Sequence, residues 1–181
     1  MIFEPRQWQL KDGRTCLMRP PLITDAAGML QTLRAVSSQS SFLLRVPEEC
    51  VETEQEEADF LTRMRDDSHR AMILAAVDGD IAGSALLSRH TRAKTRHRCD
   101  IGLALKKEYW HLGIGSSMME LLITLARGMG CLVMELECVQ GNERALRLYE
   151  RFGFFIFGQR PQGVRQPDGT FADEILMQKR L

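Results

Sequence analysis

The segment best suited to a chemical role is a glycine-containing turn between a predicted strand and a predicted long helix. It covers residues 109–116 and reads Tyr-Trp-His-Leu-Gly-Ile-Gly-Ser. The first N–H groups of a helix lack carbonyl partners, and the helix dipole adds partial positive charge there. Glycine lets the main chain approach a phosphate closely, so Gly113 and Gly115 favour anion binding, although a plain strand-to-helix turn also explains the segment taken alone. The turn lacks the third glycine of a dinucleotide fingerprint and the Gly-Lys-Ser/Thr of a nucleotide P-loop.

A second segment, residues 140–154, reads Gln-Gly-Asn-Glu-Arg-Ala-Leu-Arg-Leu-Tyr-Glu-Arg-Phe-Gly-Phe. Together the two segments resemble the GNAT superfamily of acyl-CoA-dependent N-acyltransferases. One family helix reads Asn-x-x-Ala-x-x-x-Tyr-x-x-x-Gly-Phe, which this sequence matches at Asn142, Ala145, Tyr149, Gly153 and Phe154. The resemblance implies acetyl-CoA as co-substrate, an amine as acceptor and no metal.

The family's phosphate loop reads Gln/Arg-x-x-Gly-x-Gly/Ala and is matched at Gly113 and Gly115. Trp110 stands where the family usually has Gln or Arg, so one phosphate contact is in question, and His111 beside it could supply a donor instead. Carried over, the resemblance implies that the strand before the loop binds the pantetheine arm through its backbone, and that Asn142, which also fits a plain helix cap, reaches the same arm. The implied cofactor-binding residues are Leu103, Ala104, Leu105, His111, Leu112, Gly113, Ile114, Gly115, Ser116 and Asn142.

Tyr149 resembles the family's general acid, a phenol that returns a proton to the departing CoA thiolate; a core aromatic is the alternative interpretation. An amine nucleophile must also lose a proton, and we predict Asp100 and Glu137 as candidates for its base, directly or through water. Glu135 shares a strand face with Glu137 because the two are two residues apart. For each acid, a solvated or salt-bridged role is the alternative. No cysteine lies beside a histidine in sequence, which favours direct attack over an acyl-enzyme.

The helices and strands that must position these residues are predicted from the spacing of apolar residues and from turn and capping residues. Strands are predicted at 15–19, 71–77, 81–88, 99–105, 132–139, 154–159 and 171–179, with a hairpin turn at Asp78-Gly79. Helices are predicted from a cap at Thr24 through residue 36, from a capping box at Thr53–Glu56, from about Gly113 to residue 127, and from Asn142 to residue 150. This order predicts an α+β fold, α/β-like, in one GNAT-like N-acetyltransferase domain over residues 1–181. Its mixed, mostly antiparallel sheet has about seven strands and helices on both faces.

Composition limits the partners. The 24 basic and 24 acidic residues balance, so no global charge draws the chain to nucleic acid or to a membrane. The basic run at 89–98 contains no aromatic residue to stack on bases, and a solvated hairpin loop explains it better. Five scattered cysteines lack metal-ligand spacing and indicate a reducing compartment. Neither a signal-peptide pattern nor an apolar run of about 20 residues is present, so we expect a cytoplasmic protein.

These observations predict an N-acetyltransferase that moves acetyl from acetyl-CoA to a primary amine by direct attack in a ternary complex. The acceptor stays open among small amines, amino acids and protein N-termini, because the acceptor loops at 37–52 and 160–170 vary in this fold. The alternative is a non-catalytic CoA-binding or regulatory module with the same fold. A homodimer formed through the last strands is expected from the family alone.

Overall fold

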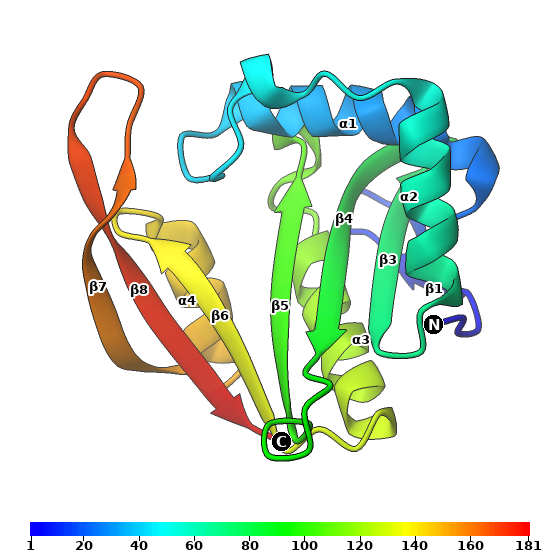
Figure 1. Ribbon diagram of the computed structural model, residues 1–181. Helices are drawn as coiled ribbons and strands as arrows, with labels where there is room; N and C mark the ends of the chain where they lie inside the picture. Colours follow the sequence, from blue (N-terminus) through cyan, green and yellow to red (C-terminus); the bar gives the residue numbers. More distant parts are fainter.

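An eight-stranded sheet forms the centre of the computed structural model, which describes residues 1–181 (Figure 1). Its strand order is β1-β2-β3-β4-β5-β6-β8-β7, and every neighbouring pair is antiparallel except β5 and β6. The predicted mixed, mostly antiparallel sheet is therefore confirmed. The strands are β1 Arg6–Gln9, β2 Thr15–Arg19, β3 Arg70–Val77, β4 Asp80–Arg89, β5 Arg98–Leu105, β6 Val133–Val139, β7 Phe155–Arg165 and β8 Phe171–Arg180.

The strand absent from the prediction is β1, which pairs antiparallel with β2 so that Trp8 lies opposite Cys16. Its sequence, Arg-Gln-Trp-Gln, carries only one apolar residue, and three of its four residues are exposed. An edge strand of this kind has no alternating apolar pattern to recognise, because only Trp8 packs against the core.

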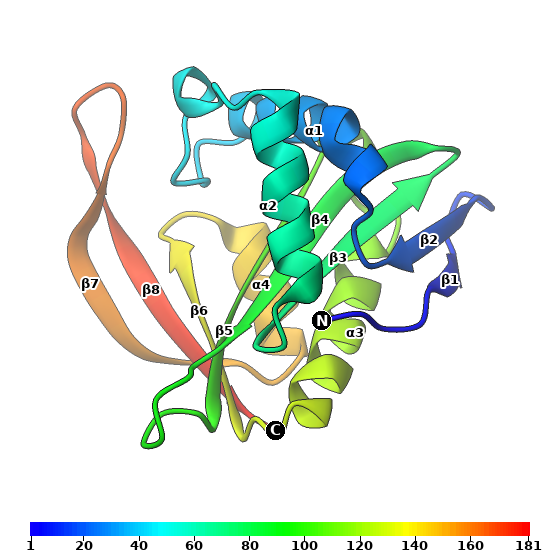
Figure 2. The ribbon, with the colours of Figure 1, turned by 45° about the vertical axis from the view of Figure 1, so that its right-hand side comes forward.

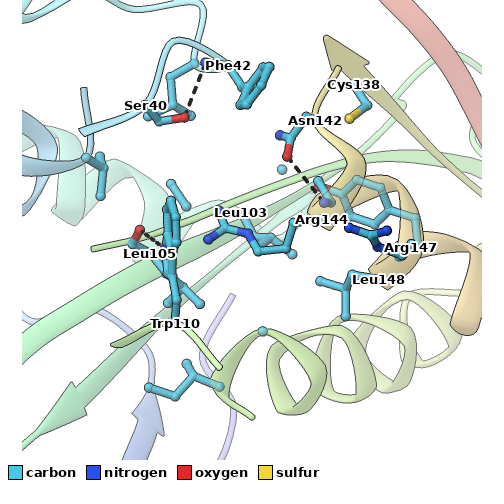
Figure 3. Close-up of a pocket in the computed structure, with 18 of the residues that line it drawn as sticks. Ser40, Phe42, Leu103, Leu105, Trp110, Cys138, Asn142, Arg144, Arg147 and Leu148 are labelled. Atoms are coloured by element: carbon cyan, nitrogen blue, oxygen red, sulfur yellow. Dashed lines mark hydrogen bonds between the residues drawn. The ribbon is translucent and has the colours of Figure 1, made fainter. Parts of the chain in front are cut away.

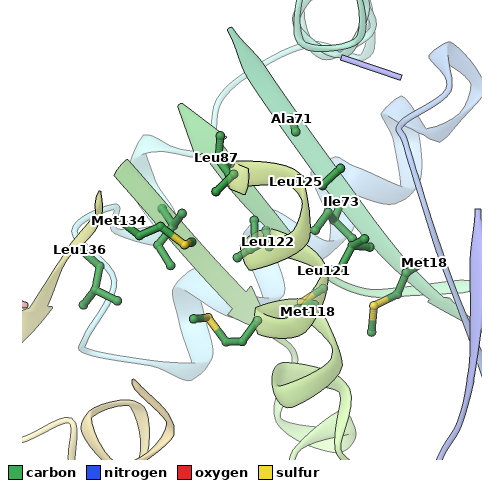
Figure 4. Packing of buried hydrophobic residues seen from close by; sticks show 14 of the residues in the cluster. Met18, Ala71, Ile73, Leu87, Met118, Leu121, Leu122, Leu125, Met134 and Leu136 are labelled. Carbon is green, nitrogen blue, oxygen red and sulfur yellow. The ribbon is translucent and has the colours of Figure 1, made fainter. Parts of the chain in front are cut away.

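Four helices cover the two faces of the sheet (Figures 1 and 2). Helices α1, Ala26–Gln39, and α2, Glu54–Asp66, pack over β3 and β4 around a small core that includes Met29, Leu61 and Leu74. Helices α3, Ile114–Gly128, and α4, Glu143–Arg151, lie on the opposite face with the main core. Figure 4 shows the apolar face of α3 over the strands, and the residues of this face are buried: Ile114, Met118, Leu121, Leu122 and Leu125. Burying such side chains is the main stabilising term of the fold.

Helix boundaries follow local hydrogen bonds. The capping box of α2 is confirmed, because the Thr53 hydroxyl accepts from the Glu56 N–H at 3.3 Å and the Glu56 carboxylate accepts from the Thr53 N–H at 2.8 Å. The predicted cap at Thr24 is wrong: Thr24 lies inside a 3₁₀ turn, Ile23–Asp25, and α1 begins at Ala26. Helix α1 also continues past residue 36 to Gln39, since the Ser38 hydroxyl bonds the Ala35 carbonyl instead of ending the helix.

The feature that creates a site is the divergence of β5 and β6. These parallel strands pair only where Arg98–Asp100 meets Val133–Glu135, and beyond that point they separate (Figure 1). Their facing edges beyond residues 100 and 135 therefore have no strand partner. Unpaired edges inside a sheet are uncommon and mark a place for another extended group.

Candidate active site

A cleft of about 620 Å³ opens where β5 and β6 diverge. Its walls come from the end of α1 and the loop after it, β5, the turn before α3, the end of β6 and α4 (Figure 3). The structure brings most of the predicted site residues to this cleft: Leu103, Ala104, Leu105, His111, Gly113, Ile114, Gly115, Ser116, Glu137, Asn142 and Tyr149. Leu112 instead packs its side chain against the core, and Asp100 lies outside the cleft.

A row of free backbone donors lies at the start of α3. The N–H groups of residues 111–115, which we call the amide row, donate to no protein acceptor, and the first turn begins with Ser116 N–H to the Gly113 carbonyl at 3.0 Å. Gly113 has a φ of +98°, a conformation that glycine adopts without steric cost. His111 also has a positive φ, +65°, which its residue type did not indicate. A row of free N–H groups at a helix N-terminus is suited to a phosphate group.

A partly buried polar cluster anchors the connection between β5 and the amide row. The Lys106 ammonium donates to both carboxylate oxygens of Asp80, at 2.7 and 2.8 Å, and the Tyr109 hydroxyl donates to the same carboxylate at 2.9 Å. Burial alone would raise the pKa of Asp80, but the hydrogen bonds from Lys106 and Tyr109 hold it below its usual value. Burial and the Asp80 carboxylate together raise the pKa of Tyr109 to about 12. The cluster ties residues 106–109 to the start of β4.

Trp110 acts as a structural residue in place of the family's usual Gln or Arg. Its indole N–H donates to the Leu105 carbonyl at 2.8 Å, and the Arg144 guanidinium lies 3.0 Å from the centre of its ring (Figure 3). The backbone N–H of Lys106 donates to the Ala82 carbonyl of β4. Successive residues of a strand direct their backbone N–H and C=O groups to opposite sides, so those of Leu103 and Leu105 point away from β4, towards β6 and the cleft. Sequence reasoning missed Arg144 because nothing in the motif marks its position.

Asn142 caps α4 and also lines the cleft. Its side-chain oxygen accepts from the Ala145 N–H at 3.3 Å, which is the capping contact. The amide nitrogen of the same side chain makes no hydrogen bond with another residue, so it can donate to a molecule in the cleft.

Tyr149 is a buried phenol at the wall of the cleft. Its side chain is 7% exposed and its ring lies 6.0 Å from that of Phe154. Burial raises the pKa of Tyr149 well above its usual value; nearby Cys138 adds to the shift and Arg144 opposes it. The raised pKa keeps the hydroxyl protonated at neutral pH. The hydroxyl makes no hydrogen bond to a protein group, so it is available as a donor.

The acids proposed as bases lie in different places. Glu137 reaches the cleft, but its carboxylate pairs with Arg160 at 2.8 Å. Asp100 lies near the start of β5 and bonds the His90 ring at 2.9 Å, away from the cleft. Glu135, also on β6, pairs with Arg98. His90, Asp100 and Glu135 offer ligand atoms within 4.8 Å of one another, but Arg98 already neutralises Glu135, which disfavours a cation there.

A family model described as the acetyltransferase (GNAT) family matches residues 38–154, which cover both the amide row and α4. The chain belongs to the GNAT acetyltransferase family. It is 25% identical over 116 residues to the L-amino acid N-acetyltransferase AaaT of Escherichia coli (strain K12), a match that covers 64% of this chain and 71% of that enzyme. It is 39% identical over 69 residues to an L-methionine sulfoximine/L-methionine sulfone acetyltransferase of Pseudomonas aeruginosa, covering 38% of this chain and 40% of that enzyme.

Solved structures agree with this GNAT assignment. An acetyltransferase of the GNAT family from Streptococcus pneumoniae superposes with a TM-score of 0.86 at 29% identity, over 92% of this chain and 99% of that one. The yncA protein of Salmonella typhimurium, solved with its cofactor acetyl-CoA, has a TM-score of 0.79 at 18% identity, over 91% of this chain and 92% of that one, which shows a shared fold. The predicted GNAT fold is confirmed.

The residues of this GNAT acetyltransferase fit the acetyl-CoA that the family uses. The amide row offers free donors for a pyrophosphate, and the open edge of β5 offers backbone groups for an amide-containing arm. No helix is long and apolar enough to cross a membrane.

Proposed function

We propose that this chain transfers an acetyl group from acetyl-CoA to a primary amine. The observation that carries the proposal is the amide row, whose five consecutive donors lack acceptors at the head of a cleft bounded by the open edge of β5. A phosphate satisfies such donors, and an extended arm satisfies such an edge. The amide row would hold the pyrophosphate, and the backbone of Leu103 and Leu105, with Asn142, would hold the pantetheine arm.

Bound acetyl-CoA supplies an activated thioester. The acceptor nitrogen attacks the carbonyl carbon, the carbon–sulfur bond breaks, and Tyr149 gives its proton to the departing sulfur. The raised pKa of Tyr149 keeps that proton in place at neutral pH. Backbone N–H groups on the β5 edge stabilise the charge that develops on the carbonyl oxygen, so positioning and fixed dipoles supply most of the rate enhancement.

We propose Glu137 as the group that accepts the amine proton, through a water molecule. It is the predicted acid that the cleft contains, and its side chain is about half exposed, so water can reach it. Its carboxylate is already held by Arg160 at 2.8 Å, an arrangement that suits a relay through water more than direct contact with the amine. Asp100 has no part in this scheme because it lies outside the cleft.

We propose an amino acid, through its α-amine, as the acceptor. The relative from Escherichia coli is named an L-amino acid N-acetyltransferase, and the relative from Pseudomonas aeruginosa is named for methionine derivatives. The part of the cleft formed by the end of α1 and the loop after it, where we place the acceptor, suits a small molecule with polar and apolar parts. It is lined by the polar side chains of Gln39 and Ser40 and by the apolar side chains of Val36, Phe42 and Leu43.

Cofactor binding is tested by calorimetric titration of acetyl-CoA into wild type, Gly113→Ala and Gly130→Ala. Both glycines have positive φ, +98° and +73°, with open space around an added Cβ, so each substitution costs about 1–2 kcal/mol of backbone strain. They lie at opposite ends of α3, and only Gly113 belongs to the amide row. We expect Gly113→Ala to weaken binding at least about tenfold and Gly130→Ala to leave it unchanged. Equal affinity of Gly113→Ala and wild type would exclude the amide row as the phosphate site.

Catalysis is tested by following thiol release with a panel of amino acids. We expect Tyr149→Phe to lower kcat by about 10²–10⁴-fold while acetyl-CoA still binds. The matched control is Tyr109→Phe, which removes the chain's other phenol hydroxyl from a structural hydrogen bond and should affect kcat little. Wild-type protein that binds acetyl-CoA but acetylates no amine would support the non-catalytic module instead.

A further inference from the structure

Helix α4 carries three arginines on one face, Arg144, Arg147 and Arg151, at helical spacings i, i+3 and i+7. All three line the cleft, and none has an acidic partner within 4.0 Å, although arginines elsewhere in the fold pair with acids, as Arg19 does with Asp25. Like charges at these spacings repel and destabilise a helix. Such an uncompensated cluster within a cleft indicates a site for an anion.

Two of the three cations are free to meet an anion beside the amide row. Arg151 donates to the Ser116 hydroxyl at 2.7 Å, which places its guanidinium directly after the row. Arg147 lies one turn earlier on α4 and reaches the cleft next to Leu148 (Figure 3). Arg144 is already engaged, because its guanidinium stacks on the Trp110 ring.

The amide row can bind one phosphate-containing group, and Arg147 and Arg151 can bind a second. Coenzyme A carries a pyrophosphate and, separately, a 3′-phosphomonoester on its ribose. That monoester has a charge of about −2 at neutral pH, with a second pKa of about 6. Guanidinium groups bind such a phosphate through paired, charge-assisted hydrogen bonds.

We propose that Arg147 and Arg151 form a second anion subsite, which binds the 3′-phosphomonoester of coenzyme A and makes the enzyme select acetyl-CoA over acetyl donors that lack this phosphate. The proposal rests on the proposed function, because it assumes that the amide row holds the pyrophosphate of the same molecule. The subsite acts in binding, and the chemistry at Tyr149 does not depend on it.

The test compares acetyl-CoA with acetyl-dephospho-CoA, which lacks only the 3′-phosphate, by calorimetry and by steady-state kinetics. The proteins are wild type, Arg147→Gln/Arg151→Gln, and the control Arg127→Gln in the last turn of α3. We expect wild type and the control to bind acetyl-CoA at least about tenfold more tightly than the dephospho donor, as one or two charge-assisted hydrogen bonds allow. In the double variant the preference should fall to within about twofold.

The outcomes separate the alternatives. The preference of wild type should also shrink below about pH 6, where the monoester loses one charge. An equal loss of affinity for both donors in the double variant would show that the arginines contact the pyrophosphate, and would overturn the proposal. Unchanged affinity for both donors would also overturn it. Failure of wild type to bind either donor would count against the proposed function itself, which distinguishes the two failures.

Discussion

The cluster of Asp80, Lys106 and Tyr109 makes a sharp prediction about stability and binding together. Asp80→Asn removes the negative charge without changing the shape of the side chain. The Lys106 side chain, which is only 8% exposed, would then have no ionic partner. Breaking a fully buried pair costs about 3–5 kcal/mol. Because the Asp80 side chain is 46% exposed and water can partly solvate the site, we expect about 1.5–3 kcal/mol here.

The assay is thermal and denaturant unfolding of Asp80→Asn beside the control Asp78→Asn. Asp78 lies two residues earlier with 69% of its side chain exposed, and its nearest cation, Arg14, is 3.6 Å away. For a chain of this length we expect the midpoint of Asp80→Asn to fall by about 3–12 °C. Asp78→Asn should stay within about 0.5 kcal/mol of wild type, as exposed sites do. Asp80→Asn/Lys106→Met should recover part of the loss, since no unpaired buried charge remains.

The same cluster sets a pH dependence. The pKa of Asp80 is held below its unfolded value, so its contribution to stability is present above about pH 4 and is lost as the pH falls further. The difference between wild type and Asp80→Asn should therefore shrink in acid. Because the cluster anchors residues 106–109, Asp80→Asn should also weaken acetyl-CoA binding several-fold. An Asp80→Asn protein as stable as Asp78→Asn would refute the reasoning.

Three further predictions concern other parts of the fold. Gly83→Ala should destabilise the protein by about 1–3 kcal/mol in denaturant titrations, because the added Cβ would clash with the Ala104 carbonyl and lie 2.9 Å from the Leu105 Cα. The control Gly102→Ala has open space around its Cβ and should be tolerated. In a Trp8→Phe background, acetyl-CoA should change the fluorescence of Trp110, since the ring lines the proposed cofactor cleft; an unaltered spectrum at saturation would contradict that placement. Strand β7 is an edge of the sheet and its Ile156 is 54% exposed, so we expect a dimer that forms through this edge. In light scattering, Ile156→Lys should convert this dimer to a monomer, whereas the control Leu132→Lys, at another exposed residue, should leave it intact.

Much of the fold could be predicted because local signals agree with it. The Asp78-Gly79 turn between two apolar runs is present with positive φ at both residues, and the apolar face of α3 is buried as its spacing indicates. The start of α1 was mispredicted because a second local hydrogen-bond pattern competes with the expected cap. Thr24 resembles a cap, but Asp25 pairs with Arg19 and accepts from the Leu22 N–H, which moves the helix start to Ala26.

The site was predictable where a motif carries backbone geometry and less so where it depends on side chains across the sheet. Gly113 and Gly115 mark the amide row, and most predicted residues reach one cleft. Asp100 was nominated from its position on the strand that leads to the loop, where family members often carry an acidic residue. The parallel pairing of β5 and β6 ends there, so Asp100 lies where the strands still touch and the cleft has not yet opened. Pairs such as Arg144 and Trp110, 34 residues apart, leave no local signal.

The departure from the family at Trp110 is compensated within the structure. A Gln or Arg at this position would place a polar or cationic group at the head of the phosphate loop, and tryptophan alone cannot do so. Here the indole N–H closes onto the Leu105 carbonyl, while its ring face carries the guanidinium of Arg144. A cation stacked on an aromatic ring is stabilised by the ring's negative face and keeps its charge. The loop therefore begins beside a positive group that α4 supplies.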